Sequence, residues 1–157
     1  MTDVAFHTGV ADKLGYTCRL LRKAWRQGAQ VVATGAPEAL SRLDTMLWIF
    51  EHEEFVPHAR LRAGERVAPL MARTPIWLAD EPGEVSGPQV LVNLGPGMAP
   101  GFERFARVLE IVSDEPADAQ QGRQRWRAYQ SAGLTPKLHN AAAAAPATPE
   151  ITRSRAD

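Results

Sequence analysis

The sequence has a single cysteine, no net charge and no long apolar run, and each absence excludes a class of protein. Cys18 cannot form an internal disulfide, which favours a reducing, cytoplasmic location. The 18 basic and 18 acidic side chains cancel, so the chain as a whole does not attract nucleic acid electrostatically. No apolar run approaches the ~20 residues that cross a bilayer, and the first residues lack the features of a signal peptide. We therefore expect a cytoplasmic protein with no membrane segment.

The sequence alternates between strand and helix patterns, which is typical of an α/β fold. Short apolar stretches predict strands at 3–9, 30–35, 76–79, 90–94 and 109–112. Apolar residues at helical spacing predict helices at 13–27, 36–50 and 115–133. Region 51–75 has neither pattern and is expected to be irregular. Because strands and helices follow one another in turn, we expect a doubly wound, mainly parallel sheet.

Length and composition predict one domain, residues 1–139, followed by a tail, residues 140–157. The tail is an alanine run broken by prolines, with few large apolar side chains to bury. Such a composition is typical of a flexible segment. A short alanine helix is the alternative, and at this length it would be only marginally stable in water.

Motifs that carry catalysis or bind cofactors are missing from the sequence. Gly9 ends the first predicted strand and Gly15 follows it, but the Lys-Ser/Thr pair of a phosphate-binding loop and the GxGxxG pattern are absent. His52 and His58 are six residues apart with Pro57 between them, a spacing that does not bring metal ligands together on a helix. No serine lies in a GxSxG turn. We expect no catalytic residue, no metal site and no cofactor, and hence a protein that is not an enzyme.

A basic, aromatic stretch, "RQRWRAYQSAG", ends the last predicted helix. Helical spacing places four of its side chains on one face: Arg123, Trp126, Arg127 and Gln130. Tyr129 and Ala132 lie toward the other face and are expected in the core. A solvated face is the usual role of such a charge run. An alternative is direct binding of single-stranded nucleic acid, with the three arginines, Trp126 and Tyr129 as a stacking platform, but zero net charge argues against it.

Two segments taken together, "LWIFEHEEFVPH" at 47–58 and "RWRAYQSAG" at 125–133, resemble the chi subunit of bacterial DNA polymerase III holoenzyme. The opening strand and "AWRQGAQVVA" at 24–33 add to the resemblance, which covers about residues 1–139. It implies a Rossmann-like, three-layer α/β/α fold without nucleotide chemistry. It also implies a non-catalytic adaptor of the clamp-loader assembly, monomeric within a larger, replisome-associated complex.

The resemblance implies two partners, the acidic C-terminal tail of single-stranded DNA-binding protein and either the psi subunit or an iron–sulfur helicase, with DNA contacted only indirectly. It assigns the tail-binding site to one group of residues: Val112, Gln120, Arg123, Trp126 and Arg127. Arg123 would bind the terminal carboxylate as a planar, bidentate donor. Val112 and Trp126 would line a pocket for the terminal phenyl ring. Where family members can carry a lysine, this chain has Ala119, so electrostatic attraction to the tail is expected to be weaker.

The resemblance assigns the psi or helicase surface to Trp48, Phe55 and Val56. Aromatic side chains dominate the binding energy of many protein interfaces, and an exposed aromatic patch suits such a surface. A core position is the alternative for these residues. For Phe50, on the apolar stripe of the second predicted helix, the core is the preferred interpretation.

Overall fold

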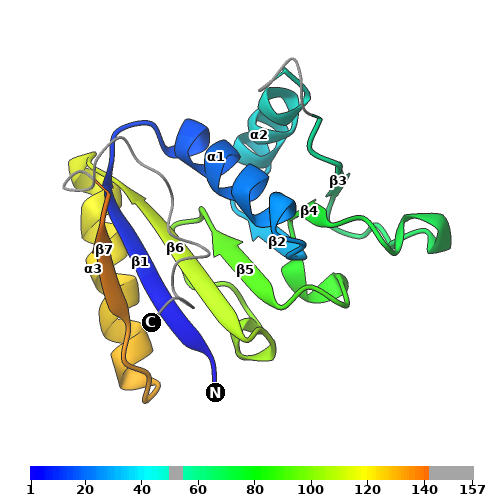
Figure 1. The fold of residues 1–157 in the computed structure, drawn as a ribbon. Helices are drawn as coiled ribbons and strands as arrows, with labels where there is room; N and C mark the ends of the chain where they lie inside the picture. Colours follow the sequence, from blue (N-terminus) through cyan, green and yellow to red (C-terminus); the bar gives the residue numbers. More distant parts are fainter. Residues whose placement is uncertain (50–54, 142–157) are drawn as a thin grey trace.

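The computed structural model describes residues 1–49 and 55–141, in which the chain forms one sheet and three α-helices (Figure 1). The strands are β1 (Asp3–Val10), β2 (Val31–Thr34), β3 (His58–Leu61), β4 (Ile76–Ala79), β5 (Val90–Asn93), β6 (Arg107–Ser113) and β7 (Lys137–Asn140). The helices are α1 (Lys13–Arg26), α2 (Pro37–Ile49) and α3 (Pro116–Ser131). The strand order is β3-β4-β2-β5-β6-β1-β7, and every neighbouring pair is parallel. The prediction of a mainly parallel α/β fold is confirmed.

The helices cover opposite faces of the sheet, which gives the three predicted layers. In Figure 1, α1 and α2 lie against one face and α3 lies against the other, behind β7 and β1. Successive side chains of a strand point to opposite faces, so each central strand contributes to two cores. In β2, Val31 and Ala33 pack in the core beneath α1 and α2, whereas Val32 packs in the core on the α3 side.

Local signals in the sequence set where the helices begin. The Asp12 carboxylate accepts a hydrogen bond from the Gly15 backbone N–H at 3.1 Å and caps the start of α1. Proline occupies the first position of α2 and of α3, where its missing N–H costs nothing. Tyr129 is fully buried, as predicted. Cys18 is fully buried as well, and burial raises the pKa of its thiol to about 12. Ala132, also expected in the core, is instead exposed at the end of α3.

Two strands differ from the prediction, and both lie at edges of the sheet. β3 falls inside the region 51–75, which was expected to be irregular, and β7 falls at the boundary of the expected tail. Their sequences, HARL and KLHN, are short and polar because an edge strand has fewer neighbours to bury it. Asn140, assigned to the tail, is the last residue of β7. Phe50 and residues 142–157 lie outside the described residues.

Candidate functional site

The N-terminal half of α3 is fixed to the end of β6 by specific contacts. The Asp118 carboxylate accepts a hydrogen bond from the Ser113 backbone N–H at 2.8 Å and forms an ion pair with Lys13 of α1 at 3.0 Å. Partial burial opposes ionisation of Asp118, but the Ser113 and Lys13 contacts outweigh it and hold the pKa of this carboxyl below its usual value. At Gly122, a Cβ atom would lie 2.9 Å from both Cγ atoms of Val112. Glycine therefore lets α3 lie unusually close to β6.

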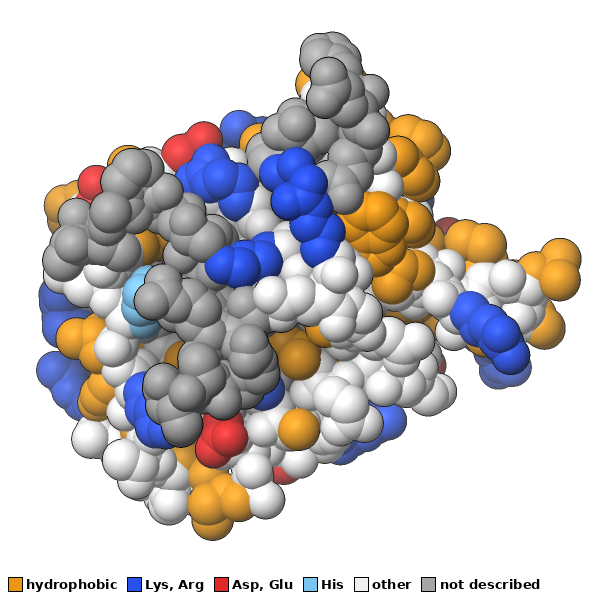
Figure 2. Space-filling model, viewed as in Figure 1, with side chains coloured by type: hydrophobic (Ala, Val, Ile, Leu, Met, Phe, Trp, Pro, Cys, Tyr) orange, Lys and Arg blue, Asp and Glu red, His pale blue; other side chains and the backbone are white. Residues whose placement is uncertain are grey.

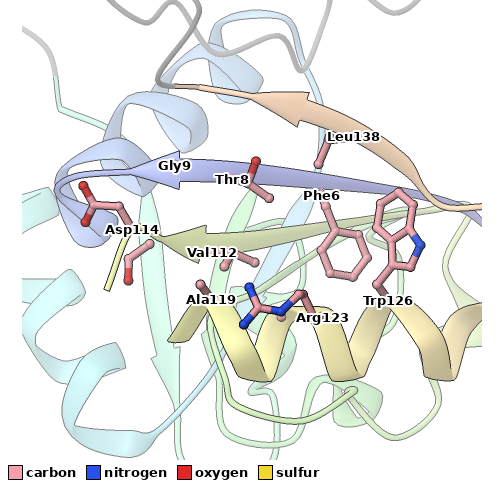
Figure 3. Close-up of a pocket in the computed structure, with 11 residues that line it drawn as sticks. Phe6, Thr8, Gly9, Val112, Asp114, Ala119, Arg123, Trp126 and Leu138 are labelled. Atoms are coloured by element: carbon pink, nitrogen blue, oxygen red, sulfur yellow. The ribbon is translucent and has the colours of Figure 1, made fainter. Parts of the chain in front are cut away.

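A hollow of about 470 Å³ opens beside this contact, between α3 and the ends of β6, β1 and β7 (Figure 3). We call it the α3 pocket. Its lining residues are Phe6, Thr8, Gly9, Val112, Ser113, Asp114, Ala119, Gly122, Arg123, Trp126 and Leu138. The Phe6 and Trp126 rings lie with their centroids 5.1 Å apart, and Leu138 of β7, the register partner of Phe6, lines the pocket beside them. The lining is mainly apolar, so the pocket suits an apolar side chain of a ligand.

Three of the five residues assigned to the tail-binding site line the α3 pocket together. Figure 3 shows Arg123 and Trp126 rising from the same side of α3, with Arg123 below Val112 of β6 and Trp126 beside Phe6 of β1. The Arg123 side chain is exposed, so its guanidinium can meet an anion at the rim of this mainly apolar hollow. Gln120 and Arg127 are exposed on α3 and do not line the pocket.

Arg125, between the two exposed arginines, has a different role. Its side chain is only 2% exposed, and its Nε atom lies 2.8 Å from Glu110 of β6, whose carboxylate is fully buried. Asn93 donates to the same carboxylate at 3.0 Å and Tyr129 donates to it at 2.5 Å. Arg125 Nη1 also donates to the Pro96 carbonyl at 2.9 Å. We call Glu110, Arg125, Asn93 and Tyr129 the buried polar network, and it joins α3 to β6 and to the loop after β5.

Burial raises the pKa of Glu110, and the Arg125 guanidinium opposes this effect. Burial and the adjacent Glu110 raise the pKa of the Tyr129 hydroxyl far above its ordinary value.

The buried polar network also bears on the alternative that α3 binds single-stranded nucleic acid. Arg125 and Tyr129 are both buried, so neither can form part of a stacking platform on α3. Sequence reasoning missed this role of Arg125, although an acidic residue inside the apolar β6 sequence signals a need for a buried partner.

The second predicted surface lies at the end of α2 and the start of β3. Trp48 is 60% exposed, and its ring centroid lies 4.9 Å from that of Phe55, which is also exposed. We call this pair the Trp48–Phe55 surface. Val56 does not belong to it, because its side chain is 1% exposed and packs in the core beneath α1 and α2.

His58 supports the Trp48–Phe55 surface from below. Its ring lies 5.4 Å from that of Trp48 and 5.7 Å from that of Phe55, measured between centroids. Its Nε2 atom lies 2.9 Å from the Asp44 carboxylate of α2, and its Nδ1 atom lies 2.7 Å from the Val56 carbonyl. The side chain is fully buried, and the residue begins β3 although the region 51–75 was expected to be irregular. Among residues 1–49 and 55–141, no group of three His, Cys, Asp or Glu side chains could hold a metal ion.

None of the helices in the described ranges is long and apolar enough to cross a membrane.

Comparison with known proteins identifies the family. The family model described as DNA polymerase III chi subunit, HolC, matches residues 1–137. The chain is 40% identical over 147 residues to DNA polymerase III subunit chi of Pseudomonas aeruginosa, covering 88% of this chain and 96% of that protein. It is 29% identical over 126 residues to DNA polymerase III subunit chi of Escherichia coli, covering 74% of this chain and 78% of that protein. The chain therefore belongs to the family of DNA polymerase III chi subunits.

Proposed function

We propose that this chi-family protein is a non-catalytic adaptor of the DNA polymerase III clamp-loader assembly, which binds the acidic C-terminal tail of single-stranded DNA-binding protein in the α3 pocket. The observation that carries the proposal is the meeting of Val112, Arg123 and Trp126 around one hollow. These residues come from β6 and from two successive turns of α3. They combine an apolar space with a single exposed guanidinium.

The chemistry of the pocket suits a peptide that ends in phenylalanine. Its phenyl ring would enter the space between Val112, Trp126 and Leu138, removing apolar surface from water. Its terminal carboxylate would bind the Arg123 guanidinium through two parallel hydrogen bonds. Trp126 packs on Phe6, so this wall of the pocket is already in place before a ligand arrives.

The acidic part of the tail would run along the exposed side of α3. Arg127 lies four residues after Arg123 and therefore on the same side of the helix. Gln120 lies on the preceding turn and can donate an amide hydrogen bond, but it carries no charge. Ala119 lines the pocket without a charge. The attraction between α3 and an acidic peptide thus comes chiefly from Arg123 and Arg127.

The Trp48–Phe55 surface would receive the psi subunit or an iron–sulfur helicase. Exposed, stacked aromatic rings provide a large apolar contact area with little side-chain freedom to lose on binding. β3 and β7 lie at opposite edges of the sheet, so this surface and the α3 pocket can be occupied together. Simultaneous occupation is what an adaptor requires.

Titration with a labelled peptide matching the C-terminal tail of the single-stranded DNA-binding protein of the same organism tests the proposal. We expect micromolar affinity for the intact peptide. Arg123→Ala, or removal of the terminal phenylalanine, should weaken binding at least tenfold, which is about 1.4 kcal/mol.

Arg127→Ala is the matched control, because it removes the same charge from the same helix outside the pocket. It should weaken binding less than Arg123→Ala does, and its effect should disappear at high salt. If Arg123→Ala binds the peptide as tightly as the parent protein, the α3 pocket is not the tail-binding site.

A further inference from the structure

Between β3 and β4 the chain leaves the sheet in a projection formed by residues 62–73, which we call the β3–β4 projection (Figure 1). It begins with a tight turn, in which the Glu65 N–H donates to the Arg62 carbonyl at 3.0 Å and Gly64 has a φ of +84°. It then forms a short 3₁₀ turn, Pro69–Met71. Both turns are closed by backbone hydrogen bonds, so the projection has a defined shape.

Asp80, just after β4, anchors the base of the β3–β4 projection. One of its carboxylate oxygens lies 2.6 Å from Nη2 of Arg60 in β3. The other accepts a hydrogen bond from the Ala63 backbone N–H at 3.0 Å. Arg60 Nη1 also donates to the Leu61 and Leu78 carbonyls. These contacts hold the outgoing chain against the edge of the sheet, so the tip is presented from a fixed base.

The tip of the projection exposes large apolar side chains, and burying them against a partner would be favourable. Leu70 is 97% exposed and Met71 is 42% exposed. Met71 also lines a hollow of about 360 Å³ at the base of the projection, whose other apolar lining residues are Ala59, Leu61, Ala68 and Trp77. Two adjacent large apolar side chains beside a hollow of this size form a surface that can receive an apolar group from a partner.

The charge of the β3–β4 projection differs from that of the whole chain. Arg62, Arg66 and Arg73 are all exposed, and Glu65 is the only acidic residue between them. The projection is therefore basic in a protein of zero net charge. Figure 2 shows basic side chains beside apolar ones on this part of the molecule. Arg66 lines the same hollow as Met71.

We propose that the β3–β4 projection is a docking surface for an acidic segment of a partner protein that carries a large apolar side chain. The apolar side chain would contact Leu70 and Met71 and enter the hollow. The acidic residues would meet Arg66, which lines the hollow together with Glu65, and Arg73, which is exposed on the same projection. Single-stranded nucleic acid fits this surface less well, because base binding uses exposed aromatic rings and Trp77, the aromatic residue of the hollow, is buried.

This docking surface is independent of the α3 pocket. The β3–β4 projection leaves from β3 at one edge of the sheet, whereas the α3 pocket borders β7 at the other edge. It also differs in what it requires of a ligand. It needs acidic side chains and an apolar group, but no terminal carboxylate, which is the group assigned to Arg123 in the proposed function.

A peptide without a free carboxyl terminus separates the two sites. The probe is acetyl-Asp-Asp-Leu-Asp-Asp-Phe-amide, added to full-length protein with ¹³C-labelled methionine methyl groups. The Met71 signal is identified by its loss in Met71→Leu. We expect a saturable shift of the Met71 signal with a dissociation constant below about 1 mM, and a weakening of about tenfold or more in Arg66→Glu and in Arg73→Glu.

Further variants test whether the probe binds the β3–β4 projection and not the α3 pocket. Leu70→Ser should also weaken the probe, and because Leu70 is exposed the variant should fold normally. Arg123→Glu should leave the Met71 titration unchanged. The proposal is overturned if the Met71 shift does not saturate, if a peptide with lysine in place of aspartate binds as well, or if Arg123→Glu abolishes the effect. A single-stranded oligonucleotide that shifts Met71 more strongly than the peptide would also overturn it.

Discussion

The α3 pocket is a hollow formed by four elements, whereas the Trp48–Phe55 surface is a pair of rings standing on the outside of the molecule. The walls of the pocket hold their positions through contacts that are themselves buried, including the buried polar network and the close approach at Gly122. The Trp48–Phe55 surface rests on little more than His58 beneath it. The two sites should therefore respond differently to substitution. Substitutions that weaken the fold should alter the pocket, whereas the aromatic surface should be altered only by substitutions of its own side chains.

Arg125→Ala should produce the largest effect on the pocket side. It leaves the Glu110 carboxylate buried without its cation, and loss of one partner of such a pair costs about 3–5 kcal/mol of unfolding free energy. Urea unfolding followed by tryptophan fluorescence would measure this. Arg127→Ala, on the exposed side of the same helix, should change stability by no more than about 0.5 kcal/mol. Equal effects of the two substitutions would show that the network does not hold α3.

Acidification should also weaken the half of the sheet that carries the pocket. Burial, with the neighbouring His139 and Arg107, lowers the pKa of His7 from 6.5 to about 4. His7 Nδ1 lies 2.5 Å from the Tyr16 hydroxyl, inside the α1 side of the sheet. Between these two pKa values only the unfolded chain gains a proton. Stability is therefore complete above pH 6.5 and falls as the pH approaches 4.

The expected loss from His7 is about 3 kcal/mol, at about 1.4 kcal/mol per pH unit. Unfolding free energies measured from pH 7.5 to 4 for the parent and for His7→Gln would test this. The parent should lose more stability than His7→Gln, which has no proton to gain. Parallel pH profiles of the two proteins would contradict the assignment.

Gly122→Ala should have an intermediate effect. The added methyl group meets Val112 at 2.9 Å, so either α3 or the valine must shift. Overpacking of this kind costs about 1–3 kcal/mol, against a gain of up to about 1 kcal/mol in helix propensity. Because Val112 lines the pocket, affinity for the tail peptide should fall as well. Gln124→Ala, exposed on the same helix, is the control and should leave both measurements unchanged.

Trp48→Ala should have the smallest effect on stability and the clearest effect on the affinity for a partner protein. The side chain is mostly exposed, so its removal should cost less than about 1 kcal/mol of unfolding free energy. Affinity for purified psi subunit or helicase from the same organism should fall at least tenfold, while affinity for the tail peptide stays the same. A loss of tail-peptide binding in Trp48→Ala would show that the two sites are coupled.

The sequence alone was sufficient to predict those strands and helices that are marked by a pattern of apolar residues. The β2 sequence VVAT and the β4 sequence IWLA are buried on both faces, and such runs are distinctive. The edge strands β3 and β7 carry no such signal, because solvent accepts polar residues along them. β7 nonetheless supplies Leu138 to the α3 pocket, so one wall of the pocket could not be predicted.

The arginines of α3 show a second limit of the sequence. Arg123, Arg125 and Arg127 alternate, and nothing in their spacing shows that the middle one is buried. Its burial depends on Glu110, which is fifteen positions away in β6 and becomes a neighbour only when the helix packs on the sheet. Val56 shows the converse. The resemblance assigned it to the same surface as Phe55, whereas successive side chains of an extended chain point to opposite sides.

The pairing of β1 with β7 determines how late in synthesis of the chain the α3 pocket can form. Phe6 and Leu138 are register partners and both line the α3 pocket, although they lie near opposite ends of the domain. A ribosome must release β7 before the first strand can acquire this neighbour, and contacts so distant along the chain form late in folding. A nascent chain that stops short of β7 lacks Leu138 and therefore has only part of the pocket lining. Tail binding at this site would therefore report that synthesis of the domain is complete.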